Sequence, residues 1–110
     1  MAQFDIYENG EQHSRHTEPY ILDVQSDLLA GLATRLVIPL IPKEYIEQPV
    51  DILNPVIRVA QQNYYLSTPQ LRSVRKTQLG RKVANIAQRQ EEIRACMDFL
   101  LRGNCDYKVI

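Results

Sequence analysis

The stretch from residue 83 to residue 103 carries the longest regular apolar pattern in the chain. Its apolar side chains recur at helical steps of three and four residues, with Gln90 in the one missing slot: Val83, Ile86, Ile93, Met97 and Leu100. This spacing places them along one face of a helix, while charges of alternating sign follow the other face. Gly103 suits the end of a helix, because glycine adopts a left-handed C-terminal cap without steric cost. The pattern predicts a helix over 83–103, whose apolar stripe must pack on the rest of the chain.

The residues before this stretch form short extended segments joined by turns. Their patterns predict strands at 3–7, 20–24, 35–40, 56–60, 64–66 and 71–79. In the first strand we expect Asp5 and Tyr7 on a solvated face. Pro39 lacks an N–H group, which predicts that its strand lies at a sheet edge or ends there. A turn at 61–63 closes a hairpin, and three prolines make 41–55 a connecting loop. The predicted fold class is mainly β and antiparallel, with a C-terminal α-helix.

Length and composition narrow the function classes. A chain of 110 residues with 45% apolar residues is expected to form one domain with one modest core. The formal net charge is zero, so bulk electrostatics gives no reason to expect binding to nucleic acid or to an acidic membrane. No apolar run approaches the roughly 20 residues that cross a bilayer, and the N-terminus does not resemble a signal peptide. We therefore expect a cytoplasmic protein with no membrane partner.

Neither the histidines nor the cysteines form a convincing metal site. His13 and His16 lie in a polar segment with no third ligand nearby, and we interpret that segment as a solvated loop. Cys96 and Cys105 are nine residues apart and match no zinc pattern. A reduced pair is the expectation for a cytoplasmic chain, and no metal or other cofactor is expected.

Charge is unevenly distributed along the chain. The segment 72–82 holds five basic residues and no acidic one, whereas the first 27 residues hold six acidic residues. One interpretation is a basic surface for nucleic acid or for an acidic peptide segment of a partner. The other is a solvated strand face that balances the acidic N-terminal part. The sequence favours the second interpretation over nucleic acid and leaves the acidic peptide open.

The sequence shows no arrangement of side chains typical of an active site. Its carboxylates are scattered, and its serines lack the strand–turn–helix context of a nucleophile. The chain is therefore predicted to bind rather than to catalyse. Leu28 and Leu29 follow a turn, and their residue type alone favours a place in the core.

Two blocks of the sequence resemble the CcdB family of toxins. They are Asp-Val-Gln-Ser-Asp-Leu-Leu at 23–29 and Thr-Arg-Leu-Val-Ile-Pro-Leu at 34–40, and the resemblance runs from about residue 2 to residue 103. It implies one toxin domain over residues 1–104, followed by a C-terminal extension at 105–110. It also implies a five-stranded antiparallel sheet curled as an SH3-like barrel, with a C-terminal helix.

The family resemblance further implies a function. Members are the toxins of type II toxin–antitoxin modules, which serve in plasmid maintenance and in transcription regulation. A non-enzymatic homodimer binds the A subunit of DNA gyrase and traps the cleaved gyrase–DNA complex, so that it acts as a topoisomerase poison. A cognate antitoxin, similar to CcdA, releases gyrase, and operator DNA is bound only through the toxin–antitoxin complex.

Six residues match the family's gyrase-contacting positions: Phe4, Leu28, Leu29, Asp98, Arg102 and Gly103. Arg102 replaces a tryptophan that stacks on an arginine of gyrase, and Asn104 replaces an isoleucine. Asp98 is placed to pair either with Arg102 or with the arginine of gyrase. Two alternatives follow: a CcdB-like protein that binds an antitoxin but no longer poisons gyrase, or an endoribonuclease toxin with the same barrel.

Overall fold

The computed structural model describes residues 1–103 and contains seven strands, six short 3₁₀ turns and one α-helix. The strands are β1 (Asp5–Asn9), β2 (Tyr20–Asp23), β3 (Thr34–Pro42), β4 (Val56–Val59), β5 (Gln62–Leu66), β6 (Arg72–Arg75) and β7 (Leu79–Asn85). The helix is α1 (Gln90–Arg102), and the 3₁₀ turns are η1 (Gln12–Ser14), η2 (Asp27–Leu29), η3 (Lys43–Tyr45), η4 (Thr68–Gln70), η5 (Lys76–Gln78) and η6 (Ala87–Arg89). The proposed extension at 105–110, with Cys105, lies outside the described residues.

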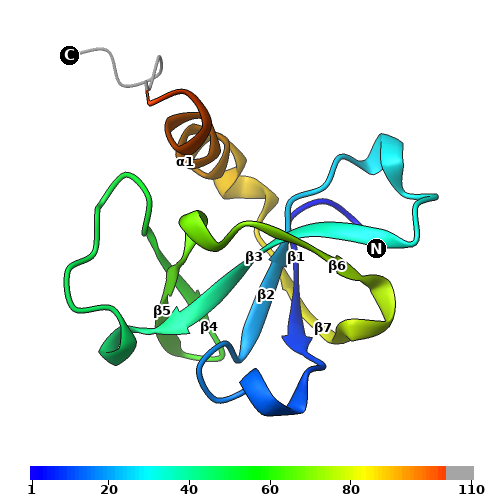
Figure 1. Cartoon of the computed structure of the whole chain (residues 1–110), viewed down its shortest axis with the longest axis horizontal. Coiled ribbons are helices and arrows are strands. Elements are labelled where there is room, and N and C mark those ends of the chain that lie inside the picture. Colours follow the sequence, from blue (N-terminus) through cyan, green and yellow to red (C-terminus); the bar gives the residue numbers. More distant parts are fainter. Residues whose placement is uncertain (104–110) are drawn as a thin grey trace.

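The strands form one antiparallel sheet in the order β4-β5-β3-β2-β1-β7, and β6 pairs with the first part of β3. The sheet curls into a half-barrel from which α1 projects at one end (Figure 1). The mainly β class with a C-terminal helix is confirmed. The count of five strands implied by the resemblance was wrong, and the six strands predicted from the pattern become seven, because the segment predicted as one strand at 71–79 holds β6 and only the start of β7. Closure into an SH3-like barrel stays a prediction.

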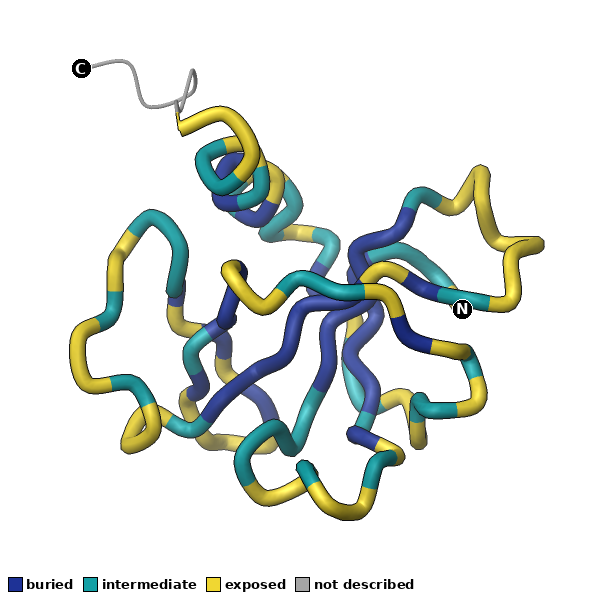
Figure 2. Tube along the Cα trace, viewed as in Figure 1, coloured by how far each residue is buried: buried dark blue, intermediate teal, exposed yellow. Residues whose placement is uncertain are grey.

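The core lies inside the curl. Ile6, Leu22, Ile38, Leu40, Leu66 and Ile93 are fully buried within one apolar cluster. A smaller cluster of Ile21, Val37 and Val74 covers the other face of the central strands. Figure 2 shows the resulting pattern, with buried central strands and exposed connecting loops. Because both faces are covered, the solvated face predicted for β1 was wrong: Asp5 and Tyr7 are 1% and 5% exposed.

Pro39 lies in a central strand, contrary to the prediction of an edge. It pairs with Ile21 of β2, while the other side of β3 bonds to β6 along 34–37 and to β5 along 40–42. The Ser67 N–H donates to the Pro39 carbonyl over 2.9 Å, so the proline nitrogen faces the interval between those two partners. The missing N–H therefore costs no ladder bond.

The helix predicted over 83–103 was wrong at its start and right at its end. Val83 and Ala84 belong to β7, which pairs with β1, and α1 begins only at Gln90 after the turn η6. Pairing with β1 outweighs the helical spacing of the early apolar residues. The end was predicted correctly: Gly103 has a φ of 67° and its N–H donates to the Phe99 carbonyl over 2.8 Å.

The β4–β5 hairpin turns at Ala60 and Gln61, one residue earlier than the sequence predicted. Both residues have positive φ, 52° and 68°, which defines the mirror-image turn that prefers Asn-Gly. Neither residue is suited to this conformation, because a Cβ in the left-handed region costs about 1 kcal/mol or more.

We therefore expect the double substitution Ala60→Asn with Gln61→Gly to raise the free energy of unfolding by about 1–2 kcal/mol, as measured by urea denaturation. The matched control is Gln62→Gly inside β5, which should lower it by about 0.5–1 kcal/mol. Equal effects of the two changes would show that backbone strain is not stored in this turn.

Candidate protein-interaction site

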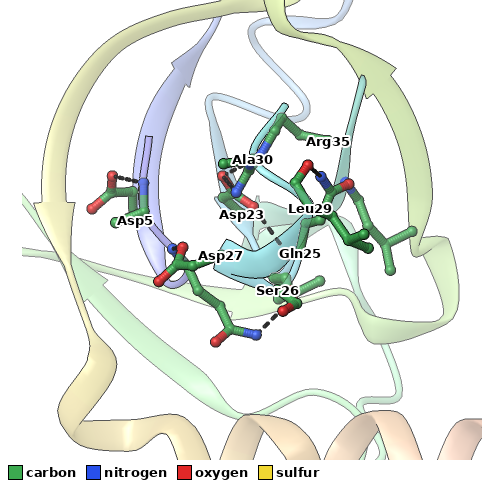
Figure 3. Close-up of polar contacts among 12 residues, drawn as sticks. Asp5, Asp23, Gln25, Ser26, Asp27, Leu29, Ala30 and Arg35 are labelled. Carbon is green, nitrogen blue, oxygen red and sulfur yellow. Dashed lines mark hydrogen bonds and ion pairs between the residues drawn. The ribbon is translucent and has the colours of Figure 1, made fainter. Parts of the chain in front are cut away.

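The polar residues after β2 build a firmly held turn. The Asp23 carboxylate accepts a hydrogen bond from the Gln25 N–H over 3.0 Å and another from Arg35 Nε over 2.8 Å (Figure 3). The Asp23 and Arg35 side chains are both 0% exposed. Burial raises the pKa of the Asp23 carboxyl above its ordinary value, although its hydrogen bonds and the nearby guanidinium act in the opposite direction. This buried ion pair fixes the end of β2 against the start of β3.

Gln25 ties the two ends of the following loop together. Its side-chain amide donates to the Leu29 carbonyl over 3.0 Å and accepts from the Leu36 N–H over 3.0 Å. Gln25 is only 7% exposed, so solvent competes little for these bonds. We call residues 26–33, which it holds in place, the leucine loop.

Three further contacts hold the leucine loop. The Ser26 hydroxyl accepts from the Leu28 N–H over 3.2 Å, and Asp27 accepts from the Gln3 N–H over 2.7 Å. From the other side, Lys76 Nζ donates to the Ala30 carbonyl over 2.7 Å. The loop is thus bonded to the N-terminal segment, to the start of β3 and to η5.

The braced loop presents leucines to solvent. Leu28 is 94% exposed, Leu29 is 50% exposed and Leu32 is 49% exposed, with Leu36 of β3 beside Gln25 at 36%. The expectation of a core position for Leu28 and Leu29, made from residue type alone, was wrong. Their exposure results from the polar bonds of the preceding residues, which hold the loop away from the core of the sheet. Several exposed apolar residues on one ordered loop are typical of a protein-binding surface.

Asp5 lies at the centre of a second polar network beside this turn. Burial by itself would raise the pKa of its carboxyl, but hydrogen bonds from Asn85, the Ala2 N–H, Lys82 and Tyr7 outweigh that effect and lower it. Burial and the neighbouring Asp5 charge raise the pKa of Tyr7 to about 12. The network therefore holds one carboxylate in its charged form between β1 and β7.

The last turn of α1 carries the other predicted contact residues. Arg102 lies 3.2 Å from Asp98, and the two side chains are 56% and 54% exposed. The single chain thus shows the internal pairing, and pairing of Asp98 with an arginine of gyrase stays a prediction. Gly103 caps the helix next to them.

Phe4 differs from the other predicted contact residues because its ring is buried, at 2% exposure. The Arg94 guanidinium lies over that ring, 5.6 Å from its centroid. The Phe4 backbone has a φ of 72°, rare for a bulky residue, and is held by bonds to Asp23 and Ile86. In the single chain, the Phe4 ring is therefore part of the apolar core.

The predicted contact residues thus fall into separate groups. Leu28 and Leu29 share the leucine loop, whereas Asp98, Arg102 and Gly103 share the end of α1, and Figure 1 shows these two places on different sides of the molecule. Sequence reasoning missed the bracing roles of Gln25 and Lys76. For Gln25, its place inside the 23–29 block was the available signal, but no local pattern connects Lys76 to this loop.

The basic segment 72–82 is largely paired within the chain. Arg72 lies 2.9 Å from Glu18, Arg81 lies 3.2 Å from Glu8, and Lys82 lies 3.3 Å from Asp5. Three of its five basic residues thus pair with acidic residues of the first 27, in agreement with the second interpretation, and the acidic peptide partner stays a prediction. Within residues 1–103 no cluster of three or more His, Cys, Asp or Glu side chains is placed to hold a metal ion.

Comparison with known proteins identifies the family. The family model described as CcdB protein matches residues 3–103, nearly the whole chain. The chain belongs to the CcdB family. Among solved structures, this CcdB-family chain is similar to an endoribonuclease in complex with its cognate antitoxin from a mycobacterial species. The TM-score is 0.73 at 10% identity, and the match covers 92% of this chain and 94% of the other, which establishes a shared fold.

Across the described part of this CcdB-family chain, no helix is both long and apolar enough to cross a membrane.

Proposed function

We propose that this CcdB-family chain is the toxin of a toxin–antitoxin system and that it binds the A subunit of DNA gyrase, trapping the cleaved gyrase–DNA complex. The observation that carries the proposal is the leucine loop, where the two leucines matching the family's gyrase-contacting pair are exposed on a braced turn. A cognate antitoxin releases gyrase. The similarity to the antitoxin-bound endoribonuclease supports a partner of that kind.

The leucine loop offers binding energy at low entropic cost. Full burial of an exposed leucine contributes about 1.5–3 kcal/mol, and Leu28 is 94% exposed before binding. The loop is already held by side-chain hydrogen bonds, so little conformational freedom remains to be lost on association. An ordered apolar turn of this kind fits into a groove of a protein partner.

The end of α1 supplies a second, polar contact. Its Asp98–Arg102 pair is more than half exposed, and such surface pairs contribute at most about 1 kcal/mol. A partner arginine can therefore replace Arg102 on the Asp98 carboxylate at small cost. The resemblance places a gyrase arginine at this position, so we propose that Asp98 takes over part of the role of the family's tryptophan.

A symmetric homodimer is part of the proposal, since it presents the leucine loop and the end of α1 twice each. Light scattering on the purified chain measures this directly. Binding to operator DNA is assigned to the complex with the antitoxin. The cytoplasmic location predicted from the sequence follows from the gyrase target.

The first test measures binding of the chain to the central fragment of gyrase A, with Arg102 intact and with Arg102→Trp. We expect submicromolar binding by the unchanged chain, and about 2- to 30-fold tighter binding by Arg102→Trp because an aromatic ring over a cation adds roughly 0.5–2 kcal/mol. If only the Arg102→Trp variant binds, the chain has the family's gyrase-binding surface, and Arg102 alone inactivates it. If neither protein binds, the gyrase target is wrong.

An endoribonuclease is the second candidate, because the structurally similar mycobacterial protein is one. Incubation of the pure chain with messenger RNA distinguishes the two. Cleavage that persists after further purification would favour the endoribonuclease. RNA that stays intact would exclude that function.

A further inference from the structure

A groove opens between the two edge strands of the curled sheet, on a part of the surface that the proposed gyrase contacts do not use. Its volume is about 470 Å³, and it is lined by 58–60 of β4 and the following turn and by 81–84 of β7. Glu8 and Tyr20 also line it, and both continue into a neighbouring hollow of about 320 Å³. The two hollows therefore adjoin at Glu8 and Tyr20.

The edge of β4 offers backbone groups to this groove. The Leu66 N–H donates to the Pro55 carbonyl, so the backbone of alternate residues Pro55, Ile57 and Val59 faces β5. Val56 and Arg58 then face outward. The Val56 carbonyl accepts from Arg89 over 2.6 Å, which leaves the N–H and carbonyl of Arg58 as the outward pair on this edge. Within residues 1–103 no strand pairs with this side of β4.

The opposite wall is not suited to strand pairing but contributes charge. The pairing of β7 with β1 shifts register twice, and such bulges twist an edge away from a neighbour. Arg81 and Lys82 of this wall are 77% and 56% exposed. The groove thus has one edge with backbone groups free for pairing and one edge with cations.

Positive charge exceeds negative charge along the groove. Arg58, Arg81 and Lys82 line it together with one carboxylate, Glu8, which pairs with Arg81 at 3.2 Å. Among residues 1–103 the hydrogen-bond partner of the Arg58 guanidinium is a neutral amide, Asn63, at 3.5 Å, and it has no carboxylate partner there. An occupant with carboxylates therefore gains electrostatically.

We infer that this groove binds an extended acidic peptide segment of a partner protein, which adds as a strand beside Arg58 of β4 and places its carboxylates against the cations. Strand addition of this kind uses backbone hydrogen bonds for affinity and side-chain contacts for specificity. Val59, Val83 and Ala84 give apolar surface for the alternate side chains of such a strand. The inference goes beyond the proposed function and does not depend on it.

The same observations argue against a nucleic-acid strand. Binding of a nucleic-acid strand without sequence preference depends on aromatic rings on which its bases stack. Tyr20 is the one aromatic ring lining the groove, and its ring is held edge-on against Tyr64 at 5.4 Å, which does not leave it free as a stacking platform.

The test is fluorescence anisotropy of the full chain with a rhodamine-labelled octapeptide, Glu-Val-Asp-Thr-Glu-Val-Asp-Thr. Two other probes are compared with it. One is the neutral peptide in which Gln replaces Glu and Asn replaces Asp, and the other is an oligothymidine with the same charge as the acidic peptide. Arg58→Glu reverses the charge at this one position without breaking an ion pair, and Arg75→Glu on β6, outside the groove, is the matched control. Thermal unfolding of each variant checks that it folds.

We expect the acidic peptide to bind the unchanged chain and the Arg75→Glu variant equally well. It should bind the Arg58→Glu variant at least about tenfold more weakly. The neutral peptide should bind the unchanged chain at least about tenfold more weakly than the acidic peptide does. The backbone amide resonances of Arg58 and Val83 should shift when the acidic peptide is added. Absence of binding, equal binding to Arg58→Glu, or preferential binding of the oligothymidine would overturn the inference. Binding of Arg58→Glu to the gyrase A fragment should be unchanged, which separates this result from the proposed function.

Discussion

Leu28→Glu is expected to weaken binding to the gyrase A fragment by about 100-fold, because the loss of a central apolar contact and the burial of a charge together remove roughly 3 kcal/mol. The free energy of unfolding should not change, since Leu28 is 94% exposed and its N–H, not its side chain, makes the contact with Ser26. Isothermal titration measures the first quantity and urea denaturation the second.

The matched control is Val50→Glu, an apolar residue 48% exposed in the loop between β3 and β4 and outside the leucine loop. It should bind the fragment as the unchanged chain does. If Leu28→Glu binds equally well, the leucine loop is not the gyrase contact. Equal weakening by both substitutions would mean that added negative charge, and not the position of Leu28, accounts for the loss.

Asp23→Ala is expected to lower the free energy of unfolding by about 3–5 kcal/mol, because it leaves the Arg35 guanidinium buried without its carboxylate. Both side chains are 0% exposed, so water cannot replace the lost contact without opening the structure. Glu8→Ala, which breaks the exposed pair with Arg81, is the comparison and should change stability by less than about 1 kcal/mol. Urea denaturation at pH 7 measures both.

Removing the other partner should give a different pH dependence. In Arg35→Met the Asp23 carboxyl loses its cation, and its pKa, which burial already raises, should rise further. A carboxyl whose pKa is higher in the folded chain binds its proton preferentially there, so stability increases as the pH falls from neutrality toward the ordinary pKa of 3.8.

We therefore expect the destabilisation by Arg35→Met, relative to the unchanged chain, to be smaller at pH 5 than at pH 7. The destabilisation by Asp23→Ala should show no such reduction, because a guanidinium does not lose its proton in this range. If both variants show the same pH dependence, the Asp23 carboxyl is not the group that titrates.

Local residue chemistry predicted most of the elements. The pattern at 56–60 predicted a strand where the structure has β4, and Gly103 marked the end of α1 correctly. The family resemblance was carried by the 23–29 and 34–40 blocks. The structure shows the two blocks joined physically, through the Asp23–Arg35 pair and the Gln25–Leu36 bond.

What the sequence by itself determined was the mainly β class of the fold with its C-terminal helix, and the turn that precedes Leu28. Only the tertiary structure decided the rest, because each remaining question depended on contacts between distant residues. Pairing with β1 made a strand of 83–85, and two partners on one side of β3 made Pro39 tolerable in a central strand. The bond from Lys76 to Ala30 helps to hold the leucine loop. Leu28 is exposed because these long-range contacts keep its loop off the core, which no local pattern records.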